Sequence, residues 1–232
     1  MPMKASGPAT EWTEIDRFGS DDETRGGVGW IAHPEEAMQR ASHALAVEGD
    51  VWVVDPVDAP GIDDLFAEFG DVAGVVVLLD RHKRDAGVIA GRHDVPVYVS
   101  DVMDGIAEDI DAPVERFHGE LPGTGYSTRT VVDNFAWTEV ALVDRENGVL
   151  VVPEAVGTTD YFLASGERLG VHPALRLKPP RRLARFEPGR VLVGHGAGIH
   201  EDATGALQDA LSGARGRTPG LYLKNIKSFL PV

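Results

Sequence analysis

The sequence predicts a single α/β domain, and three observations lead to this prediction. Short valine-rich runs alternate with helical patterns over the first hundred residues, which indicates parallel strands joined by right-handed crossovers. The pair Asn147-Gly148 separates two further apolar runs, and this dipeptide is a strong hairpin signal. A last valine run leads through glycine-rich residues into a helical pattern. The second half therefore adds antiparallel strands to a β/α repeat.

The predicted repeat begins at residue 27. Residues 27–31 and 51–55 are short apolar runs and are predicted strands. Residues 34–45 between them are predicted to form a helix, because Pro34 suits a first helical turn and acidic residues follow it. The next elements in order are a helix over 62–69, a buried strand over 75–79, a short helix over 87–91 and a strand over 95–99.

The predicted elements of the second half are less regular. They are, in order, antiparallel strands over 137–143 and 148–152, a helical turn over 158–163, an irregular basic segment over 175–190, a strand over 190–193 and a helix over 202–211. We expect residues 1–26 to be an irregular lead-in with one edge strand, residues 27–212 to form the domain, and residues 213–232 to be a tail packed on it.

The composition limits the classes of function. The 232 residues carry a net charge of −15 and include no cysteine, which excludes disulfides, thiolate metal sites and a cysteine nucleophile. The negative charge disfavours binding to nucleic acid or to an anionic membrane. No run is apolar enough to cross a bilayer and no secretory signal is recognised, so we expect a cytoplasmic protein. A small-molecule ligand and an oligomeric state both stay open.

A charged cluster follows the most apolar predicted strand. Val75 to Leu79 is followed at once by the segment Asp80 to Gly87, which is rich in charged residues. In open α/β sheets the carboxyl ends of the strands carry the functional loops, because a rigid sheet holds loops that stay open to solvent. The position of this cluster therefore indicates a functional site.

The order of these segments resembles the metallo-β-lactamase superfamily over roughly residues 27–212. The segments that carry the resemblance are Val51 to Asp58, Leu79 to Gly87, Gly87 to Ser100, Gly148 to Glu154, and the Gly194-His195-Gly196 turn. The resemblance implies a four-layer αββα sandwich. It also implies a metal centre built around the family's H-x-H-x-D-H signature, which the loop at residues 80–85 replaces here.

The resemblance assigns ligand positions residue by residue. The first histidine of the signature is Asp80, the second is His82, the aspartate is Arg84 and the third histidine is Asp85. The position of the metal-bridging carboxylate is Glu154, and that of the final histidine is His195. The family's mid-chain histidine, expected around residues 135–137, has no counterpart.

Arg84 is the largest departure from the family pattern. A guanidinium stays protonated and cannot ligate a metal, so we expect Arg84 to be a site-filling cation paired with Asp80, Asp85 or Glu154. A two-metal centre is therefore not expected. One zinc, manganese or iron ion held by His82 and His195, with Asp80 and Glu154 as further ligands, stays open, and so does a site without metal.

Simpler interpretations compete with each of these assignments. His82 can be a loop histidine bonded to acidic neighbours, and the Gly194 to Gly198 turn can be a plain strand-to-helix connection rather than a phosphate cradle. The remaining histidines at 33, 43, 93, 172 and 200 are expected to be surface or core residues. The basic residues Arg176, Lys178, Arg181, Arg182 and Arg185 are expected to lie on a solvated loop.

Two functions remain. The first is a member of the fold without a metal pair that binds a small molecule and is not a hydrolase. The second is a mono-metal hydrolase of a small ester, thioester or phosphoester, with Asp80, His82 and Asp85 as the catalytic residues.

Overall fold

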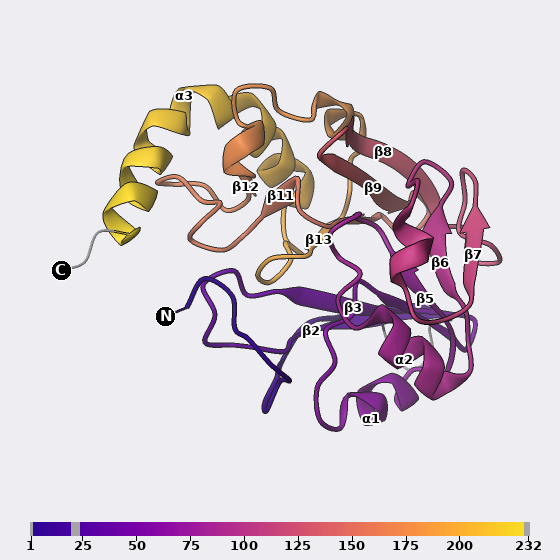
Figure 1. Ribbon diagram of the computed structural model, residues 1–232. Coiled ribbons are helices and arrows are strands. Elements are labelled where there is room, and N and C mark those ends of the chain that lie inside the picture. Colours follow the sequence, from indigo (N-terminus) through magenta and orange to yellow (C-terminus); the bar gives the residue numbers. More distant parts are fainter. Residues whose placement is uncertain (1, 20–23, 230–232) are drawn as a thin grey trace.

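Two β-sheets pack face to face, and helices cover the outer face of each, in the computed structural model, which describes residues 2–19 and 24–229 (Figure 1). Helices α1 and α2 lie against the first sheet, and α3 lies on the far side of the second. This is the predicted four-layer αββα sandwich. Among the described residues, the strand orders are β1-β2-β3-β4-β5-β6-β7 and β13-β10-β9-β8, with a separate β11-β12 pair.

The first sheet changes direction at β4. Its elements are β1 (Thr13–Phe18), β2 (Arg25–Ile31), β3 (Ala41–Val47), β4 (Asp50–Val54), α1 (Ile62–Ala67), β5 (Asp71–Val77), α2 (Ala86–His93), β6 (Val97–Ser100), the short 3-10 helix η1 (Ile106–Asp109) and β7 (Val114–Phe117). Strands β1 to β4 are antiparallel, whereas β4 to β7 are parallel with α1 and α2 as crossovers. The carboxyl ends of β4 and β5 therefore meet at one edge.

The second sheet brings two more strand ends to the same region. Its elements are β8 (Ser127–Asn134), β9 (Trp137–Asp144), β10 (Val149–Val152) and β13 (Arg190–Val193), and around it lie β11 (Val156–Gly157), β12 (Gly170–Val171), η2 (Pro173–Leu175), η3 (Arg181–Arg185) and α3 (Ala203–Phe229). The predicted β9–β10 hairpin is present, and β10 pairs in parallel with β13. Because β10 and β13 run in the same direction, Glu154 and His195 follow neighbouring strand ends.

Two hydrophobic layers hold the sandwich together. The larger one fills the space between the sheets and under α1 and α2, with Trp30, Phe66 and Leu142 almost completely buried. The smaller one lies between the second sheet and α3, and includes Leu150, Val193 and Leu207. Burial of these side chains is the main term that stabilises the arrangement.

The predicted helix over residues 34–45 is wrong. Residues 41–47 form β3, which is buried along its whole length between β2 and β4. Glu48 and Gly49 adopt positive φ angles of 55° and 94°, so the chain reverses tightly and β4 returns antiparallel to β3. The helical conformation predicted over 158–163 is limited to a single turn, in which the nitrogens of Phe162 and Leu163 both donate to the carbonyl of Thr159.

The last helix is longer than the sequence predicts. Residues 203–229 form one helix that continues through Pro219, and the hydroxyl of Tyr222 donates to the carbonyl of Pro173 at 3.0 Å. The division of the chain at residues 26 and 212 stays a prediction, and residues 1, 20–23 and 230–232 of its end segments lie outside the described residues. No helix in the described part of the chain is long and apolar enough to cross a membrane.

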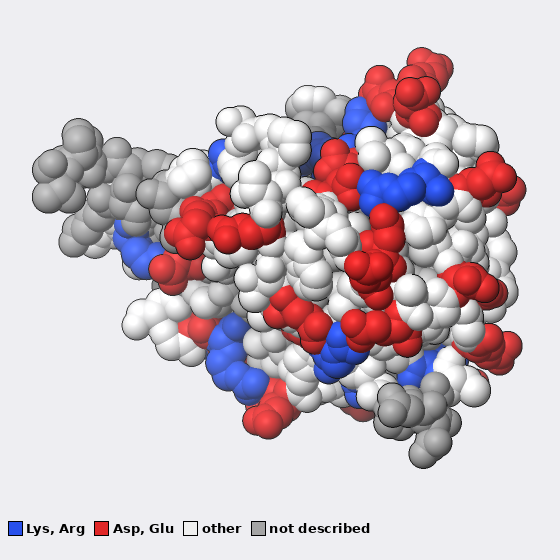
Figure 2. Space-filling model, turned by 90° about the horizontal axis from the view of Figure 1, so that it is seen from below, with Lys and Arg blue, Asp and Glu red and all other residues white. Residues whose placement is uncertain are grey.

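Charged side chains show one further departure from expectation. On the face in Figure 2, acidic side chains are spread over the surface rather than gathered in one patch. Arg176, expected on a solvated loop, is completely buried and forms an ion pair with buried Glu167. Its side chain also donates to the carbonyls of Phe162 and Val171, so it fixes the loop that precedes η2.

Candidate metal centre

Three potential metal ligands meet where strands of both sheets end. His82 lies in the loop after β5, Glu154 follows β10 and His195 follows β13. One donor atom from each side chain can be chosen so that all three atoms lie within 4.8 Å of one another. Among the described residues, this is the one group of three or more histidine, cysteine or acidic side chains close enough to share a metal ion. We refer to these residues as the three-donor cluster.

The hydrogen bonds of the two histidines direct their Nε2 atoms into the cluster. His82 Nδ1 lies 3.0 Å from Oδ2 of buried Asp55, and His195 Nδ1 lies 3.0 Å from the carbonyl oxygen of Met38. Both partners are acceptors, so each Nδ1 carries a proton and each Nε2 is the ring nitrogen that a metal ion in the cluster could bind. His195 Nε2 is buried and has no hydrogen-bond partner in the described structure.

Burial keeps His195 neutral. It holds the pKa of this imidazole well below its usual value, and the charge of the Arg84 guanidinium adds to the effect. A buried neutral imidazole with an unpaired nitrogen is what a metal ligand requires before the metal binds.

Glu154 completes the cluster at its more exposed side. Its Oε2 lies 3.5 Å from His82 Nε2 and 3.2 Å from a guanidinium nitrogen of Arg81, and its Oε1 lies 3.5 Å from His172 Nε2. Burial alone would raise the pKa of Glu154, but the contact with His82 and the charge of Arg81 outweigh it and hold that pKa well below its usual range. Glu154 is therefore an anionic donor.

Arg84 lies beside the cluster and binds main-chain carbonyls. One terminal nitrogen donates to the carbonyls of Ala41 at 2.6 Å and Asp55 at 2.7 Å. The other lies 3.2 Å from the carbonyl of Gly194 and 3.4 Å from His82 Nε2. Burial lowers the pKa of Arg84 to about 10, so the guanidinium stays charged at neutral pH.

The backbone at Arg84 directs this side chain inward. Its φ angle of 42° is left-handed, which is unusual for a residue with a long side chain. The ion pairs that the sequence predicts with Asp80, Asp85 or Glu154 are not among its hydrogen bonds, because its two terminal nitrogens donate to the ends of three strands. Its Nε is buried without a partner among the described residues. The guanidinium thus links β3, β4 and β13.

Asp80 and Asp85 are not part of the three-donor cluster. Asp80 accepts a hydrogen bond from the main-chain nitrogen of Thr138 on β9, and Asp85 accepts one from that of Asp58. A turn closed by the His82 nitrogen and the Leu79 carbonyl at 2.8 Å rotates the chain between Asp80 and His82. The structure therefore does not place either aspartate among the donors, and their catalytic role stays a prediction.

Three residues of the site went unpredicted. Asp55 was expected only as the end of a strand, although the parallel pairing of residues 51–55 with the strand before His82 puts the two strand ends together. Met38 contributes a carbonyl, which no side-chain pattern could indicate. His172, expected to be a surface or core residue, lies among Trp137, Phe162 and Glu154, and burial lowers its pKa to about 4.

A buried carboxylic acid supports Glu154 from behind. Glu139 accepts hydrogen bonds from the main-chain nitrogens of Glu154 and Ala155 and from the indole of Trp137. Burial raises the pKa of Glu139 to about 7 even against these bonds. Because all three donors are fixed in place, Glu139 positions the Glu154 backbone rather than acting on a ligand.

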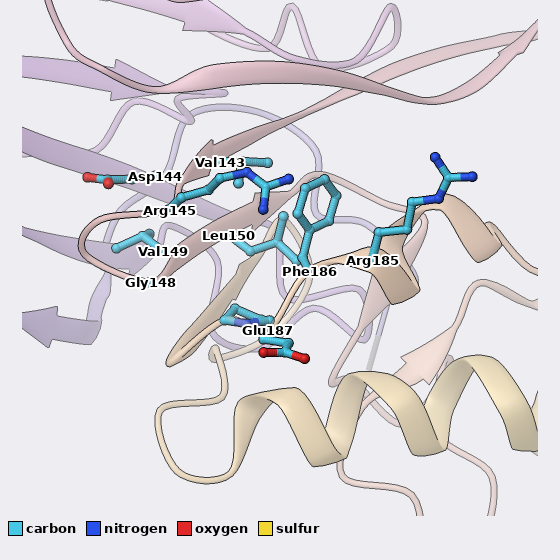
Figure 3. A pocket seen from close by; sticks show the side chains of 10 residues that line it. Val143, Asp144, Arg145, Gly148, Val149, Leu150, Arg185, Phe186 and Glu187 are labelled. Atoms are coloured by element: carbon cyan, nitrogen blue, oxygen red, sulfur yellow. The ribbon is translucent and has the colours of Figure 1, made fainter.

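The cavity in Figure 3 is remote from this chemistry. It has a volume of about 260 Å³ and lies at the β9–β10 turn, which is the opposite end of these strands from Trp137 and Glu154. Figure 3 shows Arg145 beside the ring of Phe186, and the guanidinium carbon lies 5.1 Å from the ring centre. Its lining residues include none of the three-donor cluster.

Solved structures share this arrangement of elements. No family profile and no curated sequence matches the chain. The chemotaxis sensor ODP, in a peroxy diiron form, matches with a TM-score of 0.58 and 13% identity over 89% of this chain and 98% of that chain. The metallo-β-lactamase DIM-1 matches with a TM-score of 0.55 and 13% identity over 90% of this chain and 99% of that chain. The metallo-β-lactamase FIM-1 from Pseudomonas aeruginosa, in its mono-zinc form, matches with a TM-score of 0.52 and 14% identity over 90% of this chain and 98% of that chain.

The chain has the metallo-β-lactamase fold. At these low identities the likeness concerns the fold and does not transfer an activity. Whether the site suits a metal depends on its own residues. The unpaired Nε2 of His195, the oriented Nε2 of His82 and the carboxylate of Glu154 form a donor set that suits a divalent ion.

Proposed function

We propose that this chain binds a single divalent metal ion through His82, Glu154 and His195, and uses it to bind a small molecule. The observation that carries the proposal is the unpaired Nε2 of His195, which is buried beside two other donors. Leaving such an atom unpaired costs about 1–3 kcal/mol, and coordination would remove this cost. Asp55 and the Met38 carbonyl supply the outer hydrogen bonds that metal-bound histidines usually have.

A single ion is proposed because Arg84 takes the space beside His82. A second cation there would be repelled by a guanidinium that is anchored on three carbonyls. The signature carboxylate that would hold a second ion is absent from this loop, since residue 84 is the arginine itself. An ion in the three-donor cluster would take the His82 lone pair that Arg84 faces at 3.4 Å.

Two imidazoles and one carboxylate are a donor set found with zinc and with non-haem iron, and manganese also accepts such ligands. A bound ion of this kind polarises a ligand oxygen or lowers the pKa of water. His82 and His195 are nearly inaccessible, whereas 13% of the Glu154 side chain is exposed. A ligand must therefore approach from the Glu154 side, and little room is left for a large one.

Binding without hydrolysis is our first candidate, because Asp80 and Asp85 both bond to main-chain nitrogens and lie outside the cluster. The chemotaxis sensor among the structural neighbours supports this choice, since its name describes sensing. A mono-metal hydrolase of a small ester, thioester or phosphoester is the second candidate. It is favoured by the count of three protein donors, which leaves a coordination position for water or substrate.

Native mass spectrometry of untagged protein with added zinc tests the proposal. We expect one zinc ion per chain in the wild type and none in His195→Ala. His43→Ala removes a buried histidine outside the cluster and should keep the ion. Two results would contradict the proposal. One is a wild-type protein that binds no zinc, and the other is a wild-type protein that binds two zinc ions, both of which are lost in His195→Ala. Turnover of model esters, thioesters or phosphoesters that depends on His195 would favour the second candidate.

A further inference from the structure

We infer that the ligand of this site is a small oxyanion, a carboxylate or a phosphate, and that Arg81 selects it. The inference rests on the proposed metal site and names the class of molecule that the site accepts. Arg81 lies on the exposed side of the cluster, directly against Glu154, with 42% of its side chain accessible. It is therefore a cation that contacts Glu154 and is also open to solvent.

Arg81 is held in place by three contacts. One terminal nitrogen donates to the carbonyl of Ala136 at 2.9 Å, and the other donates to Glu154 Oε2 at 3.2 Å. The guanidinium carbon lies 4.5 Å from the centre of the Trp137 ring, so the ring supports one face of the cation. A guanidinium that is fixed in advance loses little conformational entropy when it binds an anion.

Arg81 keeps donors for a ligand. A guanidinium has five N–H donors, and the two contacts above use two of them. The remaining donors lie on a planar fork that matches the oxygens of a carboxylate or phosphate. Metal coordination by Glu154 would withdraw charge from its contact with Arg81 and leave the arginine more available.

The charges around the cluster also favour an anion. Asp55 and Glu154 contribute two negative charges, and Arg81 and Arg84 contribute two positive ones. Glu139 lies behind the backbone of Glu154, and three N–H donors face its carboxylate. These arginines therefore offset the acids that contact the cluster, and a divalent ion adds two positive charges. A local excess of positive charge of this kind raises the concentration of small anions near it although the whole chain is acidic.

Isothermal titration of the zinc-loaded protein with inorganic phosphate and with acetate tests the inference, with acetamide as a neutral probe of similar shape. We expect both anions to bind and acetamide not to. Arg81→Gln should weaken anion binding by about tenfold or more at unchanged zinc content, since charge-assisted hydrogen bonds are lost. Arg81→Lys should restore part of the affinity, because it keeps the charge but not the fork.

Arg145→Gln is the matched control. Arg145 also stacks on an aromatic ring, but it lies in the remote cavity of Figure 3, so its loss should leave anion affinity unchanged. Equal anion affinity in wild type and Arg81→Gln would overturn the inference while the zinc content still supports the metal site. Binding of phosphate through Arg81 to protein that takes up no zinc would keep the inference and overturn the metal proposal.

Discussion

Arg84 extends a terminal nitrogen to within 3.4 Å of His82 Nε2, so a protein cation lies beside the nitrogen that faces the cluster. The same guanidinium donates to the carbonyls of Ala41, Asp55 and Gly194. These carbonyls belong to the ends of β3, β4 and β13. A single side chain therefore links strand ends of both sheets, and this link leads to the first prediction.

Arg84→Met should destabilise the metal-free protein by about 2–4 kcal/mol, because three enclosed carbonyl groups lose a charged donor. The carbonyls of Asp55 and Gly194 keep neutral donors, the Ser42 hydroxyl and the Ala41 nitrogen. Urea unfolding in the presence of a chelator measures the change in the free energy of unfolding. Arg81→Met removes an arginine that is 42% exposed, so it should cost under about 1 kcal/mol. Equal small losses in both variants would show that Arg84 does not link the strand ends.

Asp55→Asn should lower metal affinity by about 10- to 100-fold through the orientation of His82. Asn tolerates the φ angle of 46° at this position, and its amide oxygen can still accept from the Leu78 nitrogen. Its NH₂ group would then face His82 Nδ1, which must become an acceptor and move the proton to the metal-facing nitrogen. Competition with a zinc-binding dye measures the affinity.

Asp80→Asn is the control for this change. Asp80 accepts from the Thr138 nitrogen outside the cluster, so its isosteric replacement should leave the zinc affinity unchanged. A similar loss in both variants would mean that Asp80 is itself a ligand, as the family resemblance suggested.

Arg176→Met should destabilise the protein by about 3–5 kcal/mol, because it leaves the carboxylate of Glu167 buried with weaker compensation. Arg217, at 3.3 Å from Glu167, is the remaining cation in contact among the described residues. The double variant Arg176→Met/Glu167→Gln should recover part of this loss. Thermal unfolding of the single and the double variant measures the loss of stability, and Arg181→Met, which changes an exposed arginine, is the reference. A double variant that is no more stable than Arg176→Met would contradict the assignment of the loss to the unpaired Glu167 carboxylate.

Asp16→Asn should reduce stability in a pH-dependent way. Asp16 Oδ1 accepts from the Gly198 nitrogen at 2.7 Å, and its two oxygens contact His43 and His200. Burial alone would raise the pKa of Asp16, but these hydrogen bonds outweigh it and hold the pKa well below 3.8. Because the folded-state pKa is lowered, the stabilisation is present above the unfolded-state pKa and is lost as the pH falls below it.

The expected difference in unfolding free energy between wild type and Asp16→Asn is about 2 kcal/mol at pH 5. It should shrink as the pH falls below about 4. Asn keeps the left-handed backbone, where φ is 57°, so the comparison isolates the charge. Chemical unfolding at a series of pH values measures it, and a difference that grows toward acid pH would contradict the assignment.

The strands that sequence analysis placed correctly are buried valine runs. Residues 51–55, 75–79, 95–99 and 190–193 are too short and too apolar for surface helices, and the structure contains strands at or beside each of them. Residues 41–47 were misassigned because the alanines and Leu45 fit a helical face as well as a strand. Pairing with β2 and β4 decides the conformation there, and the local sequence does not carry that information.

The site was less accessible to sequence analysis than the fold. Glu154 and His195 follow β10 and β13, which pair in parallel, so the meeting of these two residues could be expected from parallel strand ends. His82 follows β5 of the other sheet, and only the family resemblance grouped it with them. The hydrogen bonds of Asp80 and Asp85 to main-chain nitrogens, which keep both residues out of the cluster, could not be predicted from the sequence. The contacts of His172 and the carbonyl of Met38 depend on loop conformations that no motif specifies.

A crystal structure of the zinc-loaded protein, with anomalous difference maps recorded on both sides of the zinc absorption edge, tests the central claim most directly. The account predicts one zinc peak among His82, Glu154 and His195, with the Arg84 guanidinium still on the carbonyl of Gly194. Two zinc peaks, or a displaced Arg84 with an ion in its place, would contradict it.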